Sequence, residues 1–209
     1  MKALKLFGIA IIGIMLLYTC EKQDDEITSA NDVFQKSNLE SKYGQADGTL
    51  ELPFKAHFYT KRNYSKEEEG ATYCTEDPYT AFNYQVGEGE ATHLGHFTTE
   101  MHFCGAGFDY INAEGVFVAA NGDELYFKFE EGTIGHVILY TEEDVVPPYE
   151  AHFEDPFIFN GGTGRFENAS GGGKMNSKVD LFDDEGNFIA EHQTDHIWTG
   201  TLILPKGKD

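Results

Sequence analysis

The stretch from Val116 to Phe129 reads VFVAANGDELYFKF, two apolar-rich runs joined by Asn121-Gly122. Asn-Gly is typical of a two-residue type I′ turn, in which both central residues take positive φ angles. That turn predicts a hairpin with Ala120 opposite Asp123, Val118 opposite Leu125 and Val116 opposite Phe127. The two valines, Leu125 and Phe127 would then share one face, with Phe117 and Tyr126 on the other. Because both faces carry apolar bulk, we expect one to be covered and the other to line a packed interior or meet a partner.

Short stretches rich in aromatic and β-branched residues continue on both sides of this hairpin, from Thr49 onward. The chain has 17 Phe and 11 Tyr, and such side chains fit a pleated sheet better than a helix. Gly, Asn and Asp clusters separate the stretches. They predict strands near residues 49–61, 79–87, 91–104, 108–119, 124–131, 134–141, 150–159, 174–182, 187–193 and 196–204. Some neighbouring ranges in this list are candidates for two halves of one bent strand. The sequence therefore fits eight strands as well as ten.

Residues 48–209 are predicted to form one all-β domain. No stretch longer than about ten residues keeps a helical period, so the crossover helices of parallel sheets are missing and successive strands must pair antiparallel. Many short antiparallel strands in one domain predict a barrel or a sandwich. A closed barrel leaves no exposed edge, and we expect a single antiparallel β-barrel of about eight strands.

Residues 160–173 read NGGTGRFENASGGG. The glycines permit tight turns and positive φ angles, and Phe166 and Ala169 are spaced to pack beneath the loop. A phosphate-binding loop is disfavoured because the Gly-Lys-Ser/Thr ending and the following helix are missing. The segment resembles the Gly-Thr-Gly-x-Phe-x-x-Ala-x-Gly element of the allene oxide cyclase-like barrel group, which includes plant cyclases, dirigent proteins and bacterial barrels.

This resemblance covers roughly residues 85–203, including Gly89–Gly95 and Ala119–Leu125. It implies an eight-stranded antiparallel barrel of the calycin kind with a cavity along its axis. Its motif positions concern turns and packing, namely Asn121, Gly122, Gly162, Gly164, Phe166 and Gly171. No set of positions matches the catalytic residues of the cyclases or the pocket residues of the dirigent proteins, so the catalytic residues stay unknown. The insertion 61–79 and Pro147-Pro148 depart from a minimal barrel of this kind.

Residues 1–19 have the proportions of an export signal. Lys2 and Lys5 precede an uncharged run, Leu6–Tyr18, which is too short to span a bilayer. The run ends at Cys20 and resembles a bacterial lipoprotein signal that is cleaved before a lipidated cysteine, although Tyr18 stands where a smaller residue is usual. The alternatives are an ordinary signal peptide with an incidental Cys20 and an uncleaved anchor helix.

The acidic residues after Cys20 resemble the export tag of Bacteroidetes-type lipoproteins. They predict a lipid-anchored outer-membrane protein exposed on the cell surface, with the periplasmic face as the alternative. Residues 20–47 are polar and aperiodic, which predicts a lipidated, disordered tether. Loss of residues 1–19 takes the formal charge from −21 to −23, because Lys2 and Lys5 leave with them. Such a charge disfavours nucleic acid and anionic headgroups, leaving the acyl chains on Cys20 as the membrane contact.

Cys74 and Cys104 remain after cleavage. An exported protein meets an oxidising compartment, where these two cysteines can form a disulfide that closes a loop of about thirty residues. Two buried free thiols are the alternative reading.

Eight histidines raise the question of a metal site. His96 and His102 are six residues apart, about 20 Å along an extended strand, so they cannot share an ion. His192 and His196 could converge with Asp195 only if residues 193–195 formed a turn, and zinc needs three or four ligands. We therefore predict hydrogen-bonded or exposed histidines, without a metal or cofactor. No Gly-x-Ser-x-Gly elbow appears, and a pair of carboxylates carries no weight among 36 acidic residues.

Three functions remain open from sequence. The first is a non-catalytic envelope barrel that binds a small apolar or carbohydrate ligand or an envelope protein, because the chain is rich in aromatics and has no catalytic signature. The second is a cyclase-like or isomerase-like enzyme whose cavity enforces a reactive conformation. The third is a purely structural lipoprotein.

Overall fold

The computed structural model describes residues 48–66, 70, 72–141, 143–144, 147–183 and 185–206. Cys20, the predicted signal segment 1–19 and the predicted tether 20–47 lie outside these residues. No helix of the described part is long and apolar enough to cross a membrane.

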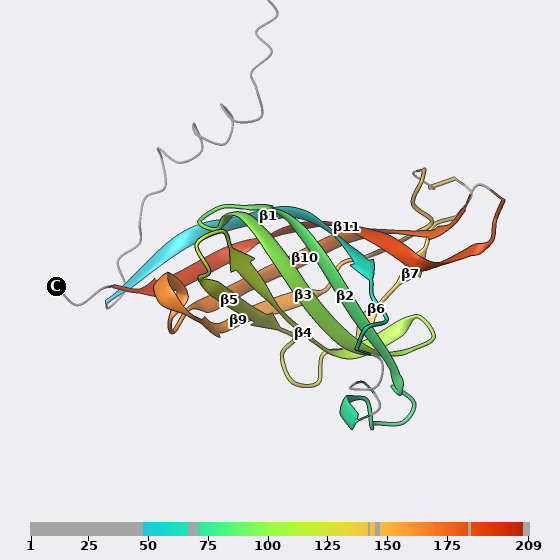
Figure 1. Cartoon of the computed structure of the whole chain (residues 1–209), viewed down its shortest axis with the longest axis horizontal. Coiled ribbons are helices and arrows are strands. Elements are labelled where there is room, and N and C mark those ends of the chain that lie inside the picture. Colours follow the sequence, from blue (N-terminus) through green and yellow to red (C-terminus); the bar gives the residue numbers. More distant parts are fainter. Residues whose placement is uncertain are drawn as a thin grey trace, which may run out of the picture. The chain divides into compact units, whose positions relative to one another are not determined.

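The predicted barrel is confirmed: eight strands close into a ring in which every pairing is antiparallel (Figure 1). The ring runs β1-β2-β3-β4-β5-β9-β10-β11 and returns to β1. Its strands are β1 (Thr49–Arg62), β2 (Ala81–Ala91), β3 (Gly95–Ala106), β4 (Asp109–Ala119), β5 (Glu124–Lys128), β9 (Pro156–Gly162), β10 (Ser170–Phe182) and β11 (Phe188–Pro205). Three short strands are added at one end, β6 (Gly135–His136), β7 (Ile138–Leu139) and β8 (Ala151–Phe153), and one 3₁₀ turn, η1 (Gly164–Phe166).

Four predicted strands are joined, divided or shortened in the structure. Residues 187–193 and 196–204 belong to the single strand β11, because residues 193–195 stay extended and pair with both β1 and β10. The predicted strand 150–159 is divided between β8 and β9 at Asp155, whose carbonyl accepts a hydrogen bond from the Met175 amide at 2.8 Å. The predicted strand 134–141 is reduced to β6 and β7, which pair with β4 and β8.

The hairpin at residues 116–129 forms, but its predicted register is wrong by one residue. Phe117 pairs with Leu125 and Gly115 with Phe127. The Ala119 amide donates to the Asp123 carbonyl at 2.9 Å, which closes a three-residue loop in place of the two-residue type I′ turn. Gly122 has a positive φ of 87° whereas Asn121 does not, and the extra loop residue shifts the strands.

The shifted register exchanges the two faces of the hairpin. Phe117, Leu125 and Phe127 point inward and are buried, while Val116, Val118 and Tyr126 are only partly covered. One face therefore lines the barrel interior, as expected, but it carries the aromatic side chain of Phe117 in place of the two valines.

The glycine-rich segment packs as predicted. Phe166 and Ala169 are buried under the loop. Gly164 and Gly171 have positive φ angles of 55° and 100°. A Cβ on Gly162 would lie 2.1 Å from the Glu124 carbonyl oxygen, so the close approach of β9 to β5 requires glycine there.

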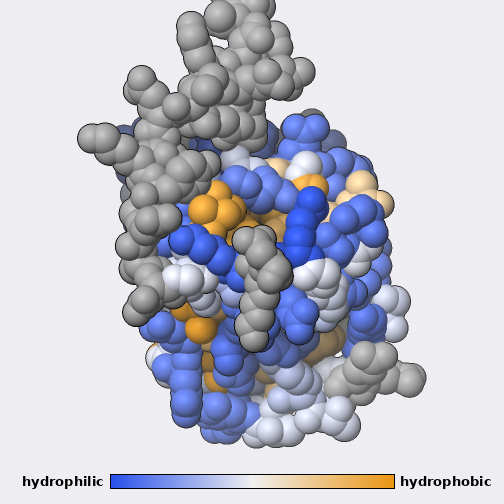
Figure 2. Space-filling model, turned by 90° about the vertical axis from the view of Figure 1, so that its left-hand side faces the viewer, coloured by the Kyte–Doolittle hydropathy of each residue, from blue (hydrophilic) through white to orange (hydrophobic). Residues whose placement is uncertain are grey.

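Alternation along β1 fills one half of the barrel. Leu52, Phe54, Ala56 and Phe58 point inward and are buried, while the residues between them are exposed. They meet an aromatic cluster centred on Trp198, whose ring lies 4.7 Å from that of Phe157 between centroids. This half is a packed core, and the outer surface at the same end is mostly hydrophilic with small hydrophobic spots (Figure 2).

Cys74 and Cys104 form the predicted disulfide, with an S–S distance of 2.01 Å. It lies on the outer face of the barrel, buried against Ile111, with Tyr79 and Phe82 around it. The disulfide fastens the segment between β1 and β2 to β3.

Candidate ligand-binding cavity

The other half of the barrel interior holds a cavity of about 390 Å³. Its walls come from the ends of strands β1 and β3, the start of β2 and β4, and the facing parts of β10 and β11. Trp198 and Phe127, whose ring centroids are 4.9 Å apart, belong both to the packed core and to the cavity lining, so they form its floor. The volume falls within the range of small-molecule sites in proteins.

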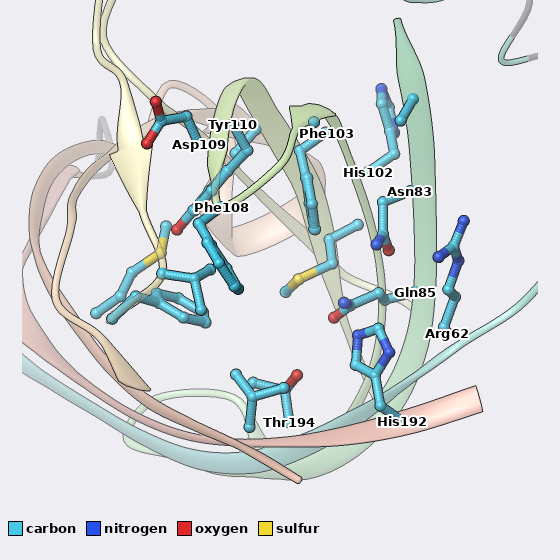
Figure 3. A pocket seen from close by; sticks show the side chains of 18 of the residues that line it. Arg62, Asn83, Gln85, His102, Phe103, Phe108, Asp109, Tyr110, His192 and Thr194 are labelled. Atoms are coloured by element: carbon cyan, nitrogen blue, oxygen red, sulfur yellow. The ribbon is translucent and has the colours of Figure 1, made fainter. Parts of the chain in front are cut away.

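One wall of the cavity is polar because inward positions of three adjacent strands carry polar residues. The antiparallel register places Arg62 of β1 beside Gln85 of β2. It also places Thr60 of β1 beside Thr194 of β11. His192 lies two residues before Thr194 in β11 and therefore points to the same inward face. Figure 3 shows Asn83, Gln85 and His192 projecting from this wall toward the centre.

A chain of hydrogen bonds runs behind this wall. The His196 ring lies between Ser177 Oγ, 2.8 Å from its Nδ1, and Thr60 Oγ1, 3.0 Å from its Nε2. Thr60 in turn donates to Gln85 Oε1 at 2.5 Å. Because the Thr60 hydroxyl has one proton, its donation to Gln85 requires that His196 Nε2–H donates to Thr60 and that Ser177 donates to Nδ1. Both ring nitrogens of His196 are then hydrogen-bonded with the imidazole neutral.

Burial lowers the pKa of His196 to about 3. Its ring is fully enclosed and stacks on Phe58 with centroids 4.4 Å apart. The imidazole is therefore a structural hydrogen-bonding group at neutral pH. Ser177 is fully buried as well and does not line the cavity, so the Ser177–His196 pair is not positioned as a nucleophile and base toward a ligand.

Acidification is expected to destabilise the barrel through His196. Its pKa is about 3 in the folded state, below the ordinary value of 6.5, so the unfolded chain binds this proton first. The stabilising contribution is full above pH 6.5 and is lost as the pH falls toward 3, amounting to about 3 kcal/mol by pH 4. Urea unfolding across this range measures it, and His196→Gln, which does not titrate, should give a shallower slope. Equal slopes for the two proteins would contradict the assignment.

Three polar atoms of the cavity-lining residues are buried without a hydrogen-bond partner in the described structure: Asn83 Oδ1, His192 Nδ1 and Trp198 Nε1. Burial and the nearby Arg62 guanidinium lower the pKa of His192. The backbone of Ile189 raises this pKa, but by less. The ring is thus neutral at pH 7. A neutral imidazole has one donor and one acceptor nitrogen, so the unpartnered Nδ1 takes either role according to the tautomer.

The opposite wall of the cavity is apolar and aromatic. Phe103, Phe108 and Tyr110 project from β3, β4 and the turn between them toward the centre (Figure 3). Tyr110 donates to Asp155 Oδ2 at 2.7 Å, which fixes its ring against the short strands at this end. Burial, followed by the charge of Asp155, raises the pKa of Tyr110, so the phenol stays protonated.

The mouth of the cavity is rimmed by exposed apolar side chains. Phe108 is 50% exposed, and Phe188, at the tip of the β10–β11 hairpin, is 58% exposed. Leu139 and Phe182 complete the rim among the cavity-lining residues. Apolar side chains gathered at one opening, and not scattered singly, indicate an interaction site.

The histidines noted in the sequence are distributed over both faces of the barrel. His93 lies in the turn between β2 and β3, with Nε2 3.0 Å from the Pro53 carbonyl oxygen. His102 faces outward beside Glu114, at 3.1 Å. His192 and His196 share the inner face of β11, but Asp195 faces the other side, where it bonds Tyr149. No group of three or more metal-ligating side chains occurs within the described ranges.

A second hollow, of about 540 Å³, lies on the outer face between β2–β5 and the side chains of Lys66, Thr72 and Tyr73. The carboxylates of Glu100 and Glu114 face it. Glu100 accepts from the Tyr84 hydroxyl at 2.6 Å and pairs with Lys66 at 2.9 Å. These two contacts lower the pKa of Glu100, whereas the acid of a carboxylate-pair hydrolase needs a raised pKa. Glu100 is therefore not suited to be the general acid of such a pair.

Sequence reasoning placed none of the cavity residues in a site except the two histidines of β11. The predicted turn residues Asn121, Gly122, Gly162, Gly164, Phe166 and Gly171 lie at or near the packed end. Thr60 and Arg62 had a readable signal, since they continue the inward alternation of Phe54 and Phe58. A scan against protein-family models and a search of curated proteins found no match to the chain.

Proposed function

We propose that this protein is a non-catalytic binding barrel of the cell envelope that holds a small, mainly apolar molecule in its open half. The observation that supports this best is the 390 Å³ cavity, which has an aromatic wall and a mouth rimmed by exposed Phe and Leu side chains. Apolar pockets with a few polar groups are typical of small-molecule sites. The enclosed position of Ser177 and His196 favours binding over nucleophilic catalysis.

Narrowing the cavity is expected to weaken binding at least tenfold. Gly105 lines the cavity, and an added Cβ would meet only the Ala81 and Asp109 carbonyl oxygens at ordinary contact distances of 3.6 and 3.9 Å. Gly105→Leu therefore places a side chain in the cavity at little cost to the backbone. The measurement is fluorescence titration with the uncharged apolar dye N-phenyl-1-naphthylamine. Thr98→Leu, on the exposed outer face of the same strand, is the matched control. Failure of wild-type protein to bind the dye, or equal binding by both variants, would contradict the proposal.

We also propose that the chain is anchored by acylation of Cys20 and belongs with the allene oxide cyclase-like barrels. The first rests on the apolar-to-acidic boundary at Cys20. The second is supported by the closed antiparallel ring and by the buried Phe166 and Ala169 of the glycine-rich motif.

Cys20→Ala is expected to abolish incorporation of labelled palmitate and to release the protein from the membrane fraction of an expressing bacterium. The reason is that the thiol of this residue is the only proposed acceptor for the lipid. Ser29→Ala, in the same predicted tether, should behave as wild type. Equal labelling of wild type and Cys20→Ala would show that Cys20 is incidental.

A further inference from the structure

The three unpartnered polar atoms of the cavity residues differ in chemistry and in depth. Trp198 is 1% exposed and lies at the floor; its indole Nε1–H is a donor. His192, 8% exposed, and Asn83 lie near the mouth; Asn83 Oδ1 is an acceptor, and His192 Nδ1 donates or accepts according to the tautomer. A buried polar atom without a partner costs about 1–3 kcal/mol, so each of the three calls for a partner.

Trp198 Nε1 and the two outer atoms are too far apart to serve a single group. His192 and Trp198 are six residues apart on β11, about 20 Å along a strand. With the strand tilt of a small barrel, this is about 15 Å along the barrel axis. Asn83 belongs to the outer end, because Gln85 pairs with Met101 and Asn83 with Phe103, one step nearer the mouth.

Charged ligand ends fit this arrangement poorly. A carboxylate at the mouth would place its oxygens against the Asn83 acceptor atom, with Asp109 also among the lining residues. An ammonium group would face the Arg62 guanidinium, which stacks on Tyr64 at 4.8 Å. The floor is formed by neutral aromatic side chains.

We propose that the ligand is an elongated, uncharged, mainly apolar molecule with a hydrogen-bond acceptor, such as a ketone, at its inner end and a donor, such as a hydroxyl, at its outer end. This rests on the proposed binding function and adds the ligand class. The inner acceptor pairs with Trp198 Nε1–H. The outer donor pairs with Asn83 Oδ1, and the apolar body contacts Phe103, Phe108 and Tyr110.

Matched twelve-carbon probes test both ends in the purified full chain. We expect 12-hydroxydodecan-2-one to bind about tenfold more tightly than dodecan-2-one and dodecan-2-one to bind more tightly than dodecane, in displacement of N-phenyl-1-naphthylamine. Asn83→Leu should remove the advantage of the hydroxyl without affecting dodecan-2-one. Trp198→Phe should remove the advantage of the ketone.

Trp198 is the only tryptophan in the chain, so its emission reports the inner end even if Trp198→Phe does not fold. Dodecan-2-one should change the emission of wild-type protein and dodecane should not. Equal affinity for dodecane and both ketones, or tighter binding of dodecanoate, would overturn the ligand class while leaving the binding function in place. Failure of the dye and of every probe to bind would overturn the binding function itself.

Discussion

Gly87→Ala is expected to lower the free energy of unfolding by about 4 kcal/mol or more, the largest effect we predict for a single methyl group. Gly87 lies in the middle of β2, between Thr60 of β1 and Thr99 of β3. A Cβ there would lie 1.8 Å from the backbone carbonyl oxygen of Tyr59. A backbone atom cannot rotate away, so relief requires that β1 and β2 separate and that ladder hydrogen bonds break.

Gly105→Ala is the control for this prediction. Gly105 is also an inward-facing glycine in a strand. The atom nearest to an added Cβ, the Ala81 carbonyl oxygen, would lie 3.6 Å away. Its effect should stay within about 1 kcal/mol. Urea unfolding followed by the emission of Trp198 measures both variants, and similar midpoints for the two would show that β1 and β2 can yield at Gly87.

Removal of the disulfide, as Cys74→Ser with Cys104→Ser, is expected to lower the free energy of unfolding by about 3–4 kcal/mol. The two cysteines are 30 residues apart, so the bridge restricts a long loop of the unfolded chain. Among the described residues of the segment between β1 and β2, Lys66 pairs with Glu100 of β3 and the Tyr73 ring contacts His102. It should become accessible to protease in the double variant while the barrel remains folded.

Reduction of the wild-type protein provides the control for the disulfide. A reducing agent should move the wild-type unfolding midpoint to that of the double variant and leave the double variant unchanged. A double variant as stable as the oxidised protein would mean that the unfolded chain is already compact across this loop.

The sequence predicted the fold class because its signals are local. The alternation in β1 and the aromatic content are properties of neighbouring residues, and they suffice for strands that pair antiparallel. Closure of the ring through β11 and β1 joins residues about 140 positions apart, such as Ala56 and Trp198, and no local pattern reports it. The register of the 116–129 hairpin was wrong because Asn-Gly also fits a three-residue loop in which only Gly122 needs a positive φ.

The cavity was harder to predict than the fold. His192 and His196 were assigned to separate strands, 187–193 and 196–204, whereas β11 is continuous and both rings point inward. Thr60, Gln85 and Ser177 are ordinary polar residues in sequence, and they become a hydrogen-bonded chain only when the closed ring brings β1, β2, β10 and β11 around His196. The division of the interior into a filled and an open half depends on that closure as well.

β1 begins and β11 ends at the same end of the barrel, and this determines where a ligand can enter the cavity. Thr49 and Pro205, the first residue of β1 and the last of β11, pair at the filled half, and the opening lies at the far ends of these strands (Figure 1). A guest molecule would therefore enter and leave at the end of the barrel opposite to the one where β1 begins and β11 ends.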